Sequence, residues 1–336
     1  MSNQGEGRLR AYLQFLAAVI WFFVARSLAH RGALSLATEQ WAPLAEELFL
    51  VFLLVVGNAA LGFWLNRQLQ AVSQQGLPLR TGWQREARLG MAVGWSLAVV
   101  CVLPMALLGG VALSVSARPA SWAWLLADAA FFALWALAEE VAFRGYGFQR
   151  FVQAVGPIGA SLGFAAIYAI VQAQLPGASH VSIGISVVLS LGLSLAYLRS
   201  NALWVSWGLN FAWKASRGLL FGLAICGNNS HSPVVQGDPM GPFWLTGGGF
   251  GLDGSWLAFF VLIAALPVIY RVTRELDYRY NTLVIVPGGI PVNLDAAART
   301  MHDAAMATPA PAAPQLIQIL PAAPPPTSGP LDEQKS

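Results

Sequence analysis

Two adjacent carboxylates and an arginine, Glu139, Glu140 and Arg144, are the residues whose types and spacing best suit chemistry. They follow an apolar run, 122–137, that is long enough to cross most of a bilayer. Charged groups in that position are costly unless they are paired or functional. Glu140 and Arg144 can meet on one helix face, whereas Glu139 points about 100° away toward a bundle interior. The pattern indicates an intramembrane functional site or, more simply, a helix end neutralised by one ion pair.

The composition of the chain is that of a membrane protein. Of its 336 residues, 56% are hydrophobic and only 10% are charged, against about 25% charged in a soluble domain. The net charge of +3 comes from arginines scattered through short loops. Since no basic patch is interleaved with aromatic residues, a nucleic-acid partner is not expected, and membrane lipid is.

Eight apolar runs predict an all-α, multi-pass transmembrane bundle of about eight spans. Placing the N-terminus in the cytoplasm leaves only Arg26, Arg31 and Arg118 in outer loops, which satisfies the positive-inside bias. Both termini are therefore predicted to be cytoplasmic, in the cytoplasmic membrane. Glu46 and Glu47 are interpreted as a solvated helix start. The predicted spans are 12–29, 44–65, 90–113, 122–137, 157–175, 181–198, 203–225 and 255–270.

The chain divides by composition into three segments. Residues 1–120 hold about three N-terminal spans, and residues 121–270 hold the charged motif and the remaining spans. Residues 271–336 are predicted to be a cytoplasmic tail. It contains a short β-prone stretch, 281–292, and a region rich in proline and alanine, 308–330. That composition is typical of extended, disordered chain.

The motif and several later segments resemble one known family. The sequence Glu139-Glu140-Val141-Ala142-Phe143-Arg144 is similar to the first motif, Glu-Glu-x-x-x-Arg, of the CPBP family of intramembrane proteases. That family includes CAAX prenyl proteases and bacterial proteins linked to bacteriocin immunity. The resemblance covers roughly 121–270 and extends over 143–146, 195–199, 203–213 and 244–251.

The resemblance implies a set of site residues and also a departure from the family. The second motif, Phe-x-x-x-His, aligns with 164–168 and places Tyr168 at the histidine position. The third, a histidine followed four residues later by asparagine, aligns with Asn210 and Lys214. In active members these histidines and a motif glutamate activate water or hold a metal. An active chain would use Glu139 as general base, Glu140 and Arg144 to orient it, and the other three residues to contact the scissile carbonyl.

The replaced histidines argue against proteolysis. Imidazole titrates near neutral pH, whereas tyrosine titrates near 10 and an amide does not titrate, and both are poor zinc ligands. The four histidines of the chain are interpreted as solvated surface residues, so no zinc or other cofactor is expected. They are His30, His180, His231 and His302.

Lys214 is one of only two lysines in the chain and lies inside a predicted span, on one face with Asn210 and Arg217. Because a buried ammonium needs a carboxylate beside it, Lys214 is predicted to contact Glu139 or Glu140. The alternative is that its side chain reaches along the helix to an interface.

Three functions remain open from the sequence. The first is an intramembrane metalloendopeptidase of the CPBP type. The second is a proteolytically silent member that binds a polypeptide or lipidated peptide as a membrane partner or immunity factor. The third is a transporter, which the intramembrane charges would suit, although the hydropathy shows no inverted repeat. The sequence does not define the ligand or the oligomeric state.

Overall fold

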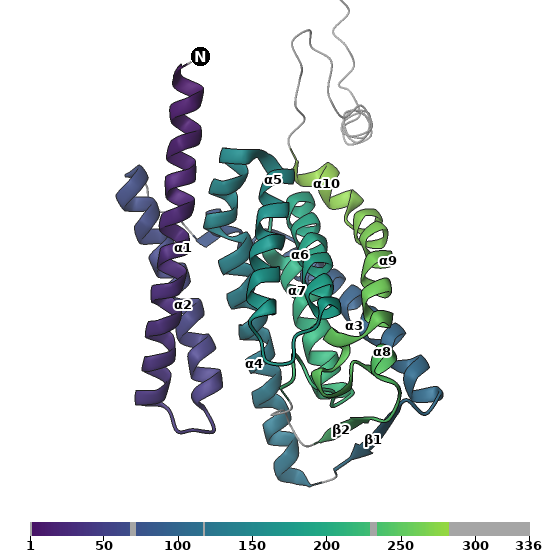
Figure 1. The fold of residues 1–336 in the computed structure, drawn as a ribbon. Helices are drawn as coiled ribbons and strands as arrows, with labels where there is room; N and C mark the ends of the chain where they lie inside the picture. The colour runs from purple at the N-terminus through teal and green to yellow at the C-terminus, as the bar shows by residue number, and fades with distance from the viewer. Residues whose placement is uncertain (1, 68–71, 117, 229–233, 282–336) are drawn as a thin grey trace, which may run out of the picture. The chain divides into compact units, whose positions relative to one another are not determined.

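A computed structural model of the protein describes residues 2–67, 72–116, 118–228 and 234–281 (Figure 1). Residues 1–281 form one compact unit. The predicted tail features at 281–292 and 308–330 lie, apart from Asn281, outside the described residues. Helices dominate this unit: α1 (Ser2–Leu36), α2 (Ala42–Asn66), α3 (Trp83–Leu107), α4 (Pro119–Arg144), α5 (Tyr146–Ala173), α6 (His180–Ser200), α7 (Leu203–Ala215), α9 (Trp256–Val272) and α10 (Arg274–Tyr280). The prediction of a predominantly helical chain with several helices able to span a membrane is confirmed.

Several of these helices are long and apolar enough to cross a membrane. Among the described residues five stretches qualify, and the pair α9 and α10, bent by 46°, makes a sixth when it is counted as one span. The five stretches are Glu6–Leu36, Ala42–Leu65, Trp83–Leu107, Ser121–Ala173 and His180–Ser200. The predicted seventh span is wrong in extent, because α7 ends at Ala215 and continues only as a π-helical turn, η2 (Ser216–Leu220).

The 53-residue stretch Ser121–Ala173 folds back on itself. The rings of Phe148 and Phe164 are 5.3 Å apart, and those of Phe143 and Tyr168 are also 5.3 Å apart. A continuous helix would separate Phe148 from Phe164 by about 24 Å. The reversal occurs at Gly156, where φ is 84° and ψ is 167°, immediately before Pro157. Helix α4 and the second half of α5 therefore run antiparallel and side by side.

One small sheet departs from the predicted all-helical fold. Strand β1 (Val111–Val115) pairs antiparallel with β2 (Val235–Pro239), and Val111 lies opposite Pro239. The predicted spans placed 111–113 at the end of one span and left 235–239 in the glycine-rich loop between the spans 203–225 and 255–270. That loop also contains α8 (Phe243–Thr246) and two short 3₁₀ turns, η3 (Gly248–Phe250) and η4 (Leu252–Gly254).

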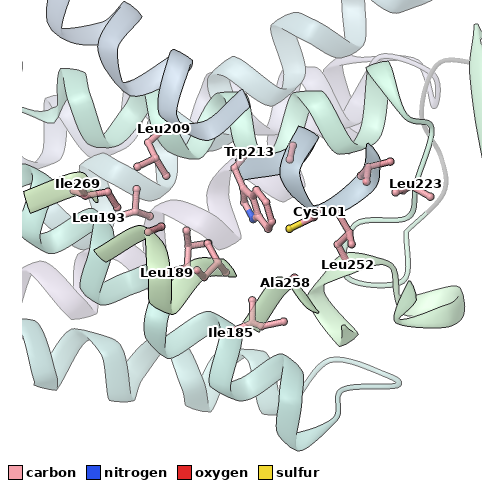
Figure 2. Close-up of a cluster of buried hydrophobic side chains, with 14 of the residues drawn as sticks. Cys101, Ile185, Leu189, Leu193, Leu209, Trp213, Leu223, Leu252, Ala258 and Ile269 are labelled. Carbon is pink, nitrogen blue, oxygen red and sulfur yellow. The ribbon is translucent and has the colours of Figure 1, made fainter. Parts of the chain in front are cut away.

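The main core lies where α3, α6, α7 and α9 meet (Figure 2). Its buried side chains include Cys101, Leu193, Leu209, Trp213 and Leu262. Burying each such side chain contributes about 1.5–3 kcal/mol when the alternative is water. This core surrounds α7, the helix that carries Asn210 and Lys214.

Glycines bring α3 and α7 into direct backbone contact. A Cβ on Gly94 would lie 2.3 Å from the carbonyl oxygen of Leu209, and one on Gly90 would lie 2.1 Å from that of Val205. Gly208 of α7 is equally close to the carbonyl oxygen of Ala87, at 2.2 Å. Small residues spaced four apart allow such close packing of membrane helices. These contacts fix the position of α7 within the bundle.

Candidate functional site

The end of α4 holds a fully buried ion pair. Arg144 Nη1 lies 3.0 Å from Glu140 Oε1, and both side chains are at most 1% exposed. Arg144 Nη2 donates to the carbonyl oxygen and to the hydroxyl of Ser190 on α6, at 3.2 and 3.1 Å. The spacing of four residues on one helix allows the pair to form. The pair therefore ties α4 to α6 behind the site.

Asn210 links the two adjacent carboxylates. Its Nδ2 donates to Glu139 Oε2 at 2.9 Å and to Glu140 Oε1 at 3.1 Å. Glu140 is thereby held between Arg144 and Asn210. The Asn210 amide lies level with the two carboxylates because Gly208 allows α7 to pack closely against α3.

Lys214 neutralises the other carboxylate. Its Nζ lies 2.5 Å from Glu139 Oε2, and the two side chains are 5% and 15% exposed. The same ammonium stands 3.7 Å from the ring centre of Trp135, one turn before Glu139 on α4. The predicted contact of Lys214 with a motif carboxylate is confirmed, and its partner is Glu139. Glu140 instead pairs with Arg144 and accepts a hydrogen bond from Asn210.

Tyr168 reaches the same carboxylate oxygen. Its hydroxyl lies 3.5 Å from Glu139 Oε2, at the limit of a hydrogen bond, and its ring packs edge-on against Phe143. The reversal at Gly156 places Tyr168 opposite the end of α4. The structure thus brings all six predicted site residues into one cluster: Glu139, Glu140, Arg144, Tyr168, Asn210 and Lys214.

A cavity of about 510 Å³ adjoins the cluster. Glu139, Tyr168 and Lys214 line it, together with Trp135 and Phe143. Glu140, Arg144 and Asn210 do not line it and instead support the lining residues from behind. We call this space the central cavity. It reaches from the middle of the bundle toward the loops that follow α5 and η2.

Another wall of the central cavity holds a third buried ion pair, which the sequence interpretation missed. Arg217 Nη1 lies 2.6 Å from Asp253 Oδ1, with side chains 2% and 8% exposed. Asp253 Oδ2 also accepts from the backbone nitrogen of Cys226 at 3.2 Å, and the thiol lies 3.4 Å from it. Burial, and then the Asp253 carboxylate, raise the pKa of the Cys226 thiol to about 12. The available signal was Arg217, an arginine in an apolar run that needs a carboxylate.

The prediction that Glu47 is solvated is wrong. Its side chain is 7% exposed, lines the central cavity and lies 4.0 Å from Arg26 Nη1 of α1. Glu46 lies nearer the surface, 2.9 Å from His30 Nδ1. The acidic pair looked solvated because the arginine partner comes from another helix, twenty residues earlier.

The residues of the cluster do not fit a zinc ion. Zinc takes Cys, His and carboxylate ligands, usually four in a tetrahedron. Here the Glu139 oxygen is held by an ammonium, an amide and a phenol. Within the described parts of the chain no three His, Cys, Asp or Glu side chains converge in a way that could hold a metal ion.

Comparisons with known proteins add nothing to this geometry. No protein-family model, no curated protein and no solved structure matches the chain.

Proposed function

We propose that the protein is a proteolytically silent, CPBP-like protein of the cytoplasmic membrane that binds a polypeptide or lipidated peptide in the central cavity. The observation that carries the proposal is the state of Glu139. One of its oxygens already receives Lys214 Nζ at 2.5 Å and Asn210 Nδ2 at 2.9 Å. A general base must be free to take a proton from water. Lys214 and Asn210 occupy the oxygen of Glu139 that would otherwise accept that proton.

The walls of the central cavity support a binding role. Aromatic and polar groups both line it, among them Trp135, Tyr168 and Gln172 together with the Lys214–Glu139 and Arg217–Asp253 pairs. Ligand sites are typically concave and largely apolar, with a few placed polar groups. A smaller apolar pocket of about 90 Å³ adjoins it between α1 and α5, and Phe22, Phe23 and Phe143 line both spaces. A peptide in the larger space with an apolar group in the smaller one would use both.

The topology belongs to the same proposal. With eight crossings, α1 to α7 and α9, one end of the bundle holds the start of α1, residues 72–82, 145–156 and 201–202, and α10. Contacts between these loops support that arrangement: Arg80 Nη2 donates to the carbonyl oxygen of Ser200 at 2.6 Å, and Asn201 Nδ2 to that of Tyr280 at 3.2 Å. Since arginines concentrate at this end, we place it in the cytoplasm.

The alternative is an active CPBP-type endopeptidase, in which Glu139 activates water while Tyr168 and Lys214 polarise the scissile carbonyl. The position of Lys214 and Tyr168 at the cavity wall favours this candidate, because both are donors that face the same space. The two proposals differ in one measurable respect, which is turnover.

The test is cleavage of a prenylated CAAX peptide by the purified protein in proteoliposomes, beside Glu139→Ala. We expect the two rates to be equal. Cleavage by the unchanged protein that is lost in Glu139→Ala would overturn the silent assignment. The combined variant Tyr168→His, Asn210→His and Lys214→Asn serves as the gain-of-function arm, and we expect it to bind zinc. Adding Glu139→Ala to that variant is the matched control and should weaken zinc binding.

A further inference from the structure

A second cavity, of about 520 Å³, lies where α3 begins and α9 passes into α10. It is separate from the central cavity, shares no lining residue with it and has no part in the proposed function. Three exposed arginines line it, Arg85 and Arg88 of α3 and Arg279 of α10. We call it the arginine cavity.

The arginines of α3 stand where helix electrostatics disfavours them. Arg85 lies in the first turn of α3 and Arg88 in the second. The N-terminal end of a helix carries partial positive charge, so cations there are unfavourable and anions are favoured. The cap residue Gly82, which lines the cavity, provides no side chain to accept from the first backbone N–H groups. The helix end and the arginines thus attract an anion to the same place.

The acidic residue of that first turn is already neutralised. Glu86 accepts two hydrogen bonds from Arg80, at 2.9 and 2.7 Å, and is 3% exposed. The Arg80 guanidinium also stands 3.3 Å from the ring centre of Tyr280. These contacts join the start of α3 to α10. With Glu86 neutralised, the wall carries three arginines and one further carboxylate, Glu275.

The remaining walls of the arginine cavity are apolar. The apolar side chains that line it beside the arginines are Leu89, Val272 and Leu276. They lie near the start of α3, at the end of α9 and on α10, where apolar segments of membrane length begin or end. The ring centre of Trp83, at the start of α3, lies 4.5 Å from that of Trp204, with the ring planes tilted by 41°. Tryptophan is typical of the boundary between hydrocarbon and headgroups. The cavity therefore combines cations and apolar surface beside two apolar segments of membrane length, and these are the groups that the phosphate and the first acyl carbons of a phospholipid need.

We propose that the arginine cavity binds an anionic glycerophospholipid, with the phosphate against Arg85, Arg88 and Arg279 and the upper acyl chain against Leu89 and Leu276. Arginine suits this role because its planar guanidinium can donate two hydrogen bonds to one phosphate. Basic pockets between membrane helices are known to hold such headgroups.

The test is a titration of the purified full-length protein in neutral detergent with phosphatidylglycerol, followed by native mass spectrometry. In Arg85→Gln/Arg279→Gln we expect the apparent dissociation constant to rise about 30-fold, which corresponds to about 2 kcal/mol for two arginines. The charge-matched control is Arg67→Gln/Arg271→Gln, which removes two exposed arginines that do not line the cavity. We expect its affinity to stay within about twofold of the unchanged protein, since surface substitutions away from a site have small effects.

Three further arms distinguish a lipid site from a site for free phosphate and from a general effect of positive charge. Arg85→Lys/Arg279→Lys should keep much of the affinity because it keeps the charge, and its thermal stability without lipid reports whether the fold is intact. Phosphatidylcholine of the same chain length should bind weakly, and inorganic phosphate should not displace phosphatidylglycerol. Equal loss in the control pair, equal binding of phosphatidylcholine, or displacement by inorganic phosphate would each overturn the proposal.

Discussion

The contact between Lys214 and Glu139 makes a quantitative prediction about stability. The charged atoms are 2.5 Å apart, and an effective dielectric constant of about 20 gives an attraction of about 7 kcal/mol. Removing both charges from water offsets most of that energy, so the net contribution of the pair is small. Removing one partner, however, leaves the other charge buried. We therefore expect Lys214→Met and Glu139→Gln each to lower the free energy of unfolding by about 3 kcal/mol, the lower end of the usual range, since Glu139 is 15% exposed.

The double variant should cost much less than the sum of the two single variants. We expect a coupling energy of about 5 kcal/mol between Lys214 and Glu139, because two single losses of about 3 kcal/mol each should be followed by a loss of only about 1 kcal/mol in the double variant. The assay is reversible unfolding in mixed micelles of the unchanged protein, both single variants and the double variant.

Glu140 provides the matched control, because it is the neighbouring carboxylate with a different cation. It pairs with Arg144 at 3.0 Å and with Asn210 at 3.1 Å. A cycle of Lys214→Met with Glu140→Gln should therefore show less coupling than the cycle with Glu139. Additive effects in the Glu139 cycle, or stronger coupling to Glu140, would refute the assignment of partners.

Three other properties can be measured directly. Reporter fusions should place the N-terminus, 72–82 and the segment after Arg271 on the cytoplasmic side, and β1 on the other side; a fusion after Arg271 reporting the outside would contradict the topology. Gly94→Leu should lower the melting temperature sharply, because its side chain would meet the Leu209 carbonyl oxygen, whereas Gly7→Leu, which meets nothing within 4 Å, should not. In a Cys101→Ala background, Cys226 should react with maleimide far more slowly than an exposed cysteine at pH 7.5, because its pKa of about 12 leaves little thiolate, and Asp253→Asn should speed the reaction.

The cluster around Glu139 was predictable because its members are unusual for their surroundings. A lysine and two carboxylates in apolar segments must find one another, since an unpaired charge there is costly. The spacing of these residues along each helix predicted which helix faces lie against each other. The Arg217–Asp253 pair could not be predicted in the same way, because Asp253 lies in a glycine-rich loop where a carboxylate needs no partner.

Element boundaries were less predictable than the helices themselves. Hydropathy continued from Leu203 to Ile225, so the sequence suggested one long span there. The α-helix ends at Ala215 because the chain turns through η2 and then Gly222, which adopts a φ of 59°. Similarly, Val111–Val115 is apolar enough to extend a helix, but pairing with a strand more than a hundred residues later makes it β1. Hydropathy reports burial and cannot report such distant pairing.

The two buried ion pairs of α7 and η2 connect that segment to different parts of the bundle. Lys214 binds Glu139 of α4, and three residues later Arg217 binds Asp253 of η4. Because a buried pair adds little net stability, its best-supported role is to specify one arrangement against others. Here a shift of the segment along its axis would break both pairs together. The central cavity therefore has a fixed shape and walls whose opposite charges neutralise each other. Such walls suit the proposed binding of a peptide, whereas the activation of water by Glu139, which the alternative proposal needs, would first require Lys214 to leave the shared oxygen.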